Sequence, residues 1–281
     1  MYSRSYDAPL SLFEDHRMVR TFGALGKGPC EYTLAQSFDM SGDSLFVLST
    51  AQSKIITYRI STGECLGELN VGSLVDRSYL ARAGGGFYIG RFAYYAGTPD
   101  STVMLHRLED DGTMRPLELT LGMLDPVPMI YQMPAFTNDF RRQGDRLYAY
   151  FRYTNYLVSL DVQSEEVELL PLDLELHREE IEEAGNNFRQ VNEIRENDLH
   201  GIGRIQASER WIAASEMIGN GNYENTMWLQ FYSHQGEPIG RIYTRDYPVA
   251  ELDGHLVYVL PSEDPSSEYA SRLYYREVIL Q

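Results

Sequence analysis

The histidines are the residues of this chain best suited to bind a metal or to transfer protons, and they are scattered along the sequence. They are His16, His106, His177, His200, His234 and His255. None forms the HExxH motif or another pair with the spacing of metal ligands. His200 differs from the others because it enters a predicted strand, where its side chain could line a central funnel. The sequence therefore predicts no metal site and keeps His200 as a candidate ligand-binding residue.

Carboxylates could serve glycoside chemistry, which needs two of them about 5 to 9 Å apart. Asp39, Asp161 and Asp173 are candidates, but aspartates at strand ends are usually turn residues. The sequence contains no glycine-rich phosphate loop, no GxSxG motif and no kinase signature. It identifies no catalytic residue and leaves the cofactor unknown.

Aromatic and basic residues in long loops could bind a ligand directly. Tyr94 and Tyr95 are adjacent and could stack against a sugar ring or a peptide, and Arg91 precedes them closely. Tyr223 occupies a comparable loop. Packing against a neighbouring loop is the competing interpretation of these rings. We keep all four as candidate ligand-binding residues.

The segment 177–198 is predicted to contain a short helical insertion. Residues 177–185 are good helix formers and end at Gly185, a plausible C-terminal cap. One interpretation is a solvated helix that caps the fold. The other is a lid that places Asn187 and Arg189 over a central funnel, so both are candidate ligand-binding residues.

These residues need a scaffold, and a repeat of short strands supplies it. A turn residue followed by an apolar strand recurs at 42–48, 84–89, 144–150, 210–214 and 254–259. An alternating strand follows at 55–60, 103–108, 156–162 and 228–233, and after a tight turn comes a more polar strand at 66–69, 116–119, 167–170 and 239–243. Glycine or aspartate at these bends supplies the positive φ of a hairpin. Four antiparallel strands repeated about every forty to sixty residues are typical of propeller blades.

The two ends of the chain are predicted to close the structure. Residues 11–15 and 18–23 form the third and fourth strands of an incomplete unit, and 272–279 form a third strand without a fourth. Pairing of 18–22 with 273–279 would protect an open sheet edge. The predicted fold is all-β: a single β-propeller domain over 1–281, with five to six four-stranded antiparallel blades, closed by its terminal strands.

One connector resembles a known group of proteins. Residues 20–23 (RTFG) and 26–32 (GKGPCEY) are similar to the "FG…GxGPGEF" connector of bacterial six-bladed propellers of the TolB-like and NHL-like type, common in Bacteroidetes. Cys30 departs from the glycine usual at its position. The resemblance implies six blades and a location in the cell envelope, periplasm or cell surface, although this sequence shows no lipobox.

Charge and hydropathy limit the partners. Forty-one acidic and twenty-four basic residues give a formal charge of −17, which would repel a nucleic acid backbone. An acidic surface favours solubility, and a basic or metal-loaded partner is the alternative. No run of eighteen apolar residues and no signal peptide occur in this chain, so no transmembrane segment is predicted and the compartment stays open. Cys30 and Cys65 are expected at opposite faces of the fold, and hence unbridged.

Two functions remain open. The long loops gather on one face of the predicted propeller, where each second strand connects to the third and each fourth strand connects to the next blade; we call it the loop face. Loops on a rigid scaffold usually carry binding residues, which favours a binding or scaffold module for a protein, peptide or glycan. The alternative is a lyase or hydrolase acting on a carbohydrate or lactone in the central funnel, where His200, Arg189 and Arg91 would be the residues to test.

Overall fold

The computed structural model describes most of the chain and divides it into two compact units. The described residues are 2–5, 8–14, 17–72, 79–90, 103–125, 137–151, 154–185, 187–197, 200–218, 227–244, 248–252, 255–261 and 271–277. Unit 1 comprises Met1–Leu121 and unit 2 comprises Gly122–Gln281.

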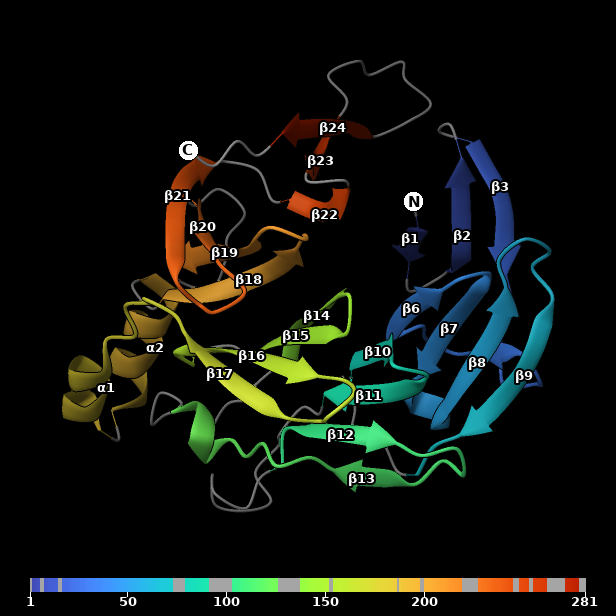
Figure 1. Ribbon diagram of the computed structural model, residues 1–281, viewed down its shortest axis with the longest axis horizontal. Coiled ribbons are helices and arrows are strands. Elements are labelled where there is room, and N and C mark those ends of the chain that lie inside the picture. Colours follow the sequence, from blue (N-terminus) through green and yellow to red (C-terminus); the bar gives the residue numbers. More distant parts are fainter. Residues whose placement is uncertain are drawn as a thin grey trace. The chain divides into compact units, whose positions relative to one another are not determined.

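Unit 1 contains three antiparallel sheets and a short parallel pair, coloured blue to green in Figure 1. The first sheet has three strands: β1 (Tyr2–Ser5), β2 (Ala8–Glu14) and β3 (Arg17–Phe22). The second has four: β6 (Ser37–Ser41), β7 (Ser44–Ser49), β8 (Lys54–Arg59) and β9 (Cys65–Asn70). The third consists of β10 (Tyr79–Ala83), β11 (Gly86–Gly90), β12 (Leu105–Leu108) and β13 (Met114–Pro116). β4 (Ala24–Leu25) pairs in parallel with β5 (Glu31–Tyr32), and the 3-10 helix η1 (Thr50–Gln52) joins β7 to β8.

Unit 2 continues the same strand order after the short helix η3 (Gly122–Leu124). One sheet is β14 (Thr137–Gln143), β15 (Arg146–Phe151), β16 (Tyr156–Asp161) and β17 (Val167–Pro171). The next is β18 (His200–Ala207), β19 (Ile212–Ile218), β20 (Met227–Tyr232) and β21 (Pro238–Thr244). The last has three strands: β22 (Pro248–Leu252), β23 (His255–Pro261) and β24 (Ser271–Glu277). Helices α1 (Arg178–Ala184) and α2 (Phe188–Asn197) lie next to each other between β17 and β18 (Figure 1).

The sheet β6–β9 shows why these residues form blades. Side chains alternate between the two faces of a strand, and both faces of β7 are buried. Leu45 and Val47 belong to one apolar core together with Phe22 and Tyr32 of the preceding segment. Phe46 and Leu48, on the other face, belong to a second core, which includes Leu80, Ile89 and Leu108 of the following sheet. A sheet with an apolar core on each face is the packing expected of a propeller blade.

The predicted fold class is confirmed, with changes at the ends of the chain. Every second, third and fourth strand named above appears near its expected position, and the insertion at 177–198 is helical. Within the described residues, four antiparallel sheets have four strands and two have three, which gives six antiparallel sheets in all. The N-terminal sheet also contains β1, a strand that the sequence pattern did not indicate. β3 pairs with β2, and β24 pairs with β23. The closure of the fold by pairing of residues 18–22 with residues 273–279 stays a prediction.

Candidate functional site

The connector between β3 and β6 is folded tightly around its glycines and Glu31. The N–H of Gly28 donates to Oε2 of Glu31 at 2.8 Å. A Cβ atom at Gly26 would lie 2.0 Å from the same oxygen. A side chain at position 26 would displace the Glu31 carboxylate, so glycine there permits this close approach.

Tyr32 anchors the end of this connector in the core. Its buried hydroxyl accepts the N–H of Leu10 at 2.6 Å and donates to the carbonyl of Phe22 at 2.9 Å. Burial raises the pKa of the Tyr32 hydroxyl above its ordinary value, and the hydrogen bond from Leu10 offsets part of that effect. Because one side chain ties two strands of the first sheet to the connector, the main-chain groups before Tyr32 have a fixed position.

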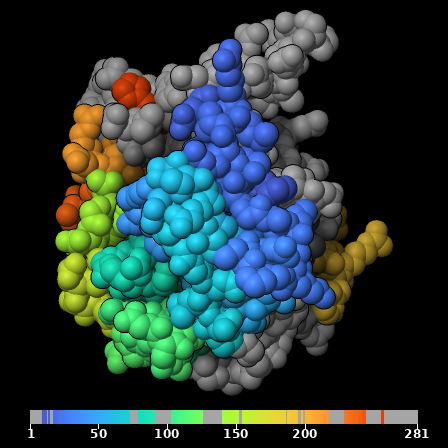
Figure 2. Space-filling model, turned by 90° about the vertical axis from the view of Figure 1, so that its right-hand side faces the viewer, coloured from blue at the N-terminus to red at the C-terminus, as the bar shows by residue number. Residues whose placement is uncertain are grey.

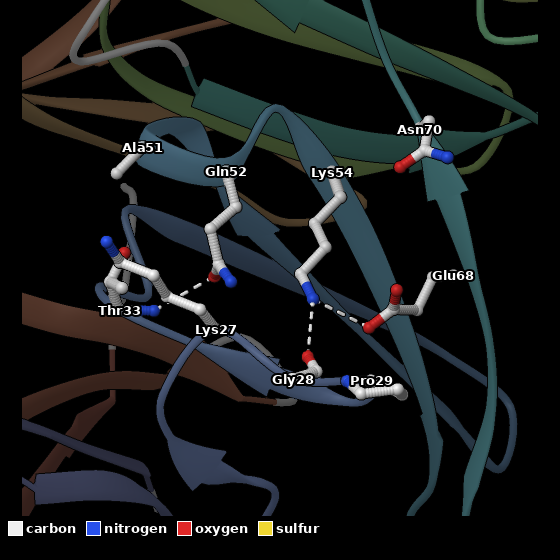
Figure 3. A pocket seen from close by; sticks show the side chains of 9 residues that line it. All are labelled: Lys27, Gly28, Pro29, Thr33, Ala51, Gln52, Lys54, Glu68 and Asn70. Carbon is white, nitrogen blue, oxygen red and sulfur yellow. Dashed lines mark hydrogen bonds and ion pairs between the residues drawn. The ribbon is translucent and has the colours of Figure 1, made fainter.

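A pocket of about 810 Å³ lies beside the connector in unit 1, within the size range of small-molecule sites. Its lining comes from the connector, from η1 with the start of β8, and from the end of β9: Lys27, Gly28, Pro29, Thr33, Ala51, Gln52, Lys54, Glu68 and Asn70 (Figure 3). The segment between β7 and β8 and the connector into β6 are the elements that define the loop face. The pocket therefore lies at the end of the sheet where a binding site is expected.

An ion pair forms one wall of the pocket. Nζ of Lys54 lies 2.7 Å from Oε1 of Glu68 and donates to the carbonyl of Gly28 at 3.1 Å (Figure 3). The same oxygen of Glu68 accepts the N–H of Cys30 at 2.5 Å. Burial alone would raise the pKa of Glu68, but the hydrogen bonds from Lys54 and Cys30 and the charge of Lys54 outweigh it, so this pKa lies below its ordinary value.

Gln52 closes the pocket near its base and has little capacity left for a ligand. Its Oε1 accepts the N–H of Thr33 at 3.0 Å and the hydroxyl of Ser49 at 2.9 Å, and its Nε2 donates to the carbonyl of Gly26 at 3.2 Å. These bonds hold η1 against the connector. Gln52 thus shapes the pocket rather than presenting free polar groups to it.

Other lining groups can still form hydrogen bonds. Oγ1 of Thr33 is buried and has no partner among the described residues. Lys27 is exposed and has no ion-pair partner in the part of the chain that the structure describes. The sequence contains only two lysines, Lys27 and Lys54, and both line this pocket. Both lysine side-chain amines of the chain therefore lie at this pocket.

Cys30 and Cys65 form a disulfide, which corrects the expectation that they are unbridged. Their Cα atoms are 6.0 Å apart, and 35 positions separate them in the sequence. The expectation failed because the connector lies against β8 and β9, so that Cys30 is beside Cys65, the first residue of β9. The hydroxyl of Tyr58 in β8 donates to the carbonyl of Cys30 at 2.7 Å, and the N–H of Cys30 donates to Glu68 in β9. The bridge fixes the connector to β9, and both segments line the pocket.

The surface of unit 1 gives the setting of these segments. In Figure 2 the cyan residues that include β9 are exposed beside the darker blue residues of the N-terminal segments. β9 itself is mostly exposed, whereas β7 is almost wholly buried. The outer strand thus carries Glu68 and Asn70 to the surface, where a ligand can reach them.

Unit 2 brings together a second polar group, at the loop face of the sheet β18–β21. Glu175, His177 and His200 each offer one ligand atom, and these atoms lie within 4.8 Å of one another. Oε1 of Glu175 is 3.9 Å from Nε2 of His177, and the centroids of the two imidazole rings are 6.2 Å apart. Behind them, Nδ1 of His200 is 2.7 Å from Oε1 of the buried Glu216.

The residues that the sequence analysis proposed as ligand contacts lie in different parts of the structure. His200 is the first residue of β18, as predicted, and lies in this second group. Asn187 is exposed and caps α2, because its Oδ1 accepts the N–H of Gln190 at 3.3 Å. Arg189 is exposed on α2. Arg91, Tyr94, Tyr95 and Tyr223 lie outside the described residues. The lid and stacking roles of these residues stay predictions.

Sequence reasoning missed most of what the structure assembles. No spacing rule selected Lys54, Glu68, Glu175 or Glu216. A usable signal was present in the alternation of 172–177, where Leu172, Leu174 and Leu176 are buried and the residues between them are exposed or half-buried. Such alternation places Glu175 and His177 on one side of an extended segment.

Comparisons with known proteins agree with this architecture. A family model described as a 6-bladed β-propeller matches residues 10–170. No curated protein matches the sequence. Among solved structures, the chain is similar to a Bacteroides fragilis protein described as exported, with 14% identity and a TM-score of 0.62 over 90% of this chain and 74% of that chain.

Two further similar structures are more distant. They are the hydrazine synthase of Kuenenia stuttgartiensis, with 11% identity and a TM-score of 0.48, and the extracellular domain of a B. thetaiotaomicron protein described as a one-component system, with 10% identity and a TM-score of 0.46. They align with 89% and 97% of this chain, which spans 61% and 30% of theirs.

Proposed function

Because this chain belongs to the family of 6-bladed β-propellers, we propose that it is a binding module that holds a short, polar glycan in the pocket beside the connector of unit 1. The observation that carries the proposal is the pocket itself, about 810 Å³ in volume, at the loop face, with six polar side chains among its nine lining residues. Propellers host many unrelated functions, so the lining groups of this pocket, and not the fold, indicate the class of ligand.

The chemistry of the lining favours a ligand dense in hydroxyl groups. Lys27 and Lys54 supply ammonium donors, Glu68 supplies a carboxylate acceptor and Asn70 supplies both an amide donor and an acceptor. Thr33 adds a hydroxyl that is buried and has no partner among the described residues. Only Pro29 and Ala51 offer side chains that are wholly apolar. A sugar can use donors and acceptors placed this closely.

The disulfide supports a location outside the reducing cytosol. Disulfides persist in the periplasm, at cell surfaces and in secreted proteins, and are rare in the cytosol. Cys30 and Cys65 form one here, and a protein described as exported shares the fold. In the part of the chain that the structure describes, no helix has the length and apolar character needed to cross a membrane. The disulfide therefore supports a binding function in the cell envelope or at the cell surface.

Two finer points belong to the same proposal. The connector at 20–32 supports a relationship with the TolB-like and NHL-like propellers, within the six-bladed family. The continuous strand order of the two units supports a single propeller domain over 1–281.

A glycan array with the purified chain tests the proposed function. Lys27→Gln is expected to weaken binding of the retained glycan by about tenfold or more, since a hydrogen bond to a charged group contributes about 1.5 to 3 kcal/mol. Arg59→Gln is the matched control, because it removes one exposed positive charge of the same sheet outside the pocket lining. Binding that is equally weak in both variants, or retention of peptides and no glycans, contradicts the proposal.

The two lysines permit an independent measurement. Lys27 is exposed and Lys54 is almost fully buried, so an amine-acylating reagent should modify Lys27 first. The bound glycan should slow modification of Lys27, measured by mass spectrometry of the digested protein. An unchanged rate at saturating glycan would place the ligand elsewhere.

A further inference from the structure

We propose that Glu175, His177 and His200 of unit 2 bind one divalent transition-metal ion, with zinc as the ion that best matches the ligand set. Two imidazoles and one carboxylate are a common set for such ions, and three protein ligands leave a position for water or a substrate. The proposal does not depend on the pocket in unit 1, because the two sites share no residue.

The distances suit a small ion. Ligand atoms around a tetrahedral zinc ion with bonds of about 2.0 to 2.1 Å are roughly 3.3 Å apart. Nε2 of His177 and Oε1 of Glu175 are already 3.9 Å apart, and all three ligand atoms lie within 4.8 Å of one another. Closing the site requires side-chain rotation only. The Glu175 side chain is 68% exposed and can make that movement without disturbing the core.

The main chain holds the three residues in place. Leu174 and Leu176 are buried on either side of Glu175, so Glu175 and His177 project from the opposite side of that segment. The N–H of His200 donates to the carbonyl of Glu175 at 3.1 Å. This bond joins the segment before α1 to the first residue of β18, although 25 positions separate the two in the sequence.

Each histidine has a carboxylate at its Nδ1 atom. Oε1 of Glu216 lies 2.7 Å from Nδ1 of His200, and Oε1 of Glu180 lies 3.4 Å from Nδ1 of His177. Metal-binding histidines usually donate the N–H of one ring nitrogen to a carboxylate or carbonyl, which fixes the tautomer and strengthens the other nitrogen as a ligand. Both histidines have such a partner, and in both it leaves Nε2 as the ligand atom.

Glu216 is itself supported by a buried polar network. Nε2 of Gln230 donates to Oε2 of Glu216 at 2.5 Å, and the hydroxyl of Tyr232 donates to Oε1 of Gln230. Glu216 is 6% exposed. Burial of a carboxylate is costly unless cations and donors compensate it. A cation bound to His200 would add to that compensation, and the network keeps Glu216 oriented toward the imidazole.

Metal titration of the full chain tests the proposal. After dialysis against a chelator, the wild type is expected to bind one equivalent of Zn²⁺ by calorimetry and by elemental mass spectrometry. Glu175→Gln and His177→Gln should weaken the affinity at least tenfold. Glu183→Gln, on an exposed glutamate of the same helical insertion, is the matched control and should bind as the wild type does. Ca²⁺, which prefers oxygen ligands, should not displace the zinc.

Glu216→Gln separates a positioning role from direct ligation. It should lower zinc affinity about 10- to 100-fold, as other substitutions behind a metal-binding histidine do, and it should change the visible spectrum of the Co²⁺-loaded protein. If this buried substitution unfolds the chain, the exposed Glu175→Gln variant still tests whether the site binds zinc. The proposal would be overturned if the wild type bound no zinc in the titration. It would also be overturned if Glu175→Gln and His177→Gln bound zinc as tightly as Glu183→Gln does, or if Ca²⁺ displaced the zinc.

Discussion

Nζ of Lys54 lies 2.7 Å from Oε1 of Glu68, although the Lys54 side chain is only 7% exposed. The two residues are diagonal neighbours on adjacent strands, because Lys54 pairs with Asn70 and Ile56 pairs with Glu68. Diagonal partners on one face of a sheet are within reach of long side chains. The pair places a buried ammonium group at the wall of the pocket, where it also fixes the carbonyl of Gly28.

Lys54→Met should lower the free energy of unfolding by about 1 to 3 kcal/mol, because it leaves acceptors of a partly buried network without their donor. Urea unfolding at neutral pH measures the change. Arg59→Met is the control, since it breaks a surface pair with Glu64 whose side chains are 44% and 59% exposed, and such pairs contribute about 0 to 1 kcal/mol. Equal losses in the two variants would show that the burial of Lys54 has no energetic consequence.

Acid should weaken the protein through Glu68. The pKa of this carboxyl in the folded chain lies below its ordinary value of 4.5, so the charged form is favoured by folding. Its contribution to stability is present above the unfolded pKa and is lost as the pH falls through the lower, folded pKa. Glu68→Gln should therefore flatten the decline of stability below about pH 4.5, measured by urea unfolding across pH. Glu64→Gln should leave a steeper decline than Glu68→Gln does.

Reduction of the disulfide should destabilise unit 1. Cys30 and Cys65 are 35 positions apart, and a bridge that closes a loop of this length contributes about 2 to 4 kcal/mol, mainly by restricting the unfolded chain. Thermal unfolding with and without a reductant measures the loss. The variant with both cysteines replaced by serine should resemble the reduced protein and should not respond to the reductant. If the reductant lowers the stability of that variant by the same amount, its effect does not come from the bridge.

Gly112→Ala should disturb the end of β9 and with it the pocket. Gly112 has a φ of 85°, and a Cβ atom there would lie 2.0 Å from the carbonyl oxygen of Asn70. The carbonyl belongs to the main chain and must shift, so we expect a loss of about 2 to 4 kcal/mol in the free energy of unfolding.

Gly85→Ala separates the clash from the backbone strain at Gly112. Gly85 has a φ of 78° and no atom within 4 Å of its Cβ position, so its replacement should cost only about 1 kcal/mol. Chemical denaturation of both variants provides the comparison. A Gly112→Ala variant as stable as Gly85→Ala would contradict the close approach to Asn70.

The sequence alone determined the strand repeat and the blade architecture, because both depend on local chemistry. Side chains alternate with a period of two along a strand, and turn glycines such as Gly42 and Gly63 have the positive φ that the hairpins require. The helical insertion was predictable for the same reason, since Gly185 and the helix formers before it act over a few residues.

Only the tertiary structure decided where distant side chains meet. The Cys30–Cys65 bridge, the Lys54–Glu68 pair and the group of Glu175, His177 and His200 each join segments whose approach depends on how connectors fold against strands. A spacing rule uses neighbours along the chain, so it cannot detect the main-chain bond between His200 and Glu175 or the hydrogen bonds that hold Cys30 against β8 and β9. Burial converts such approaches into fixed contacts, because a polar group removed from water must find a partner within the fold.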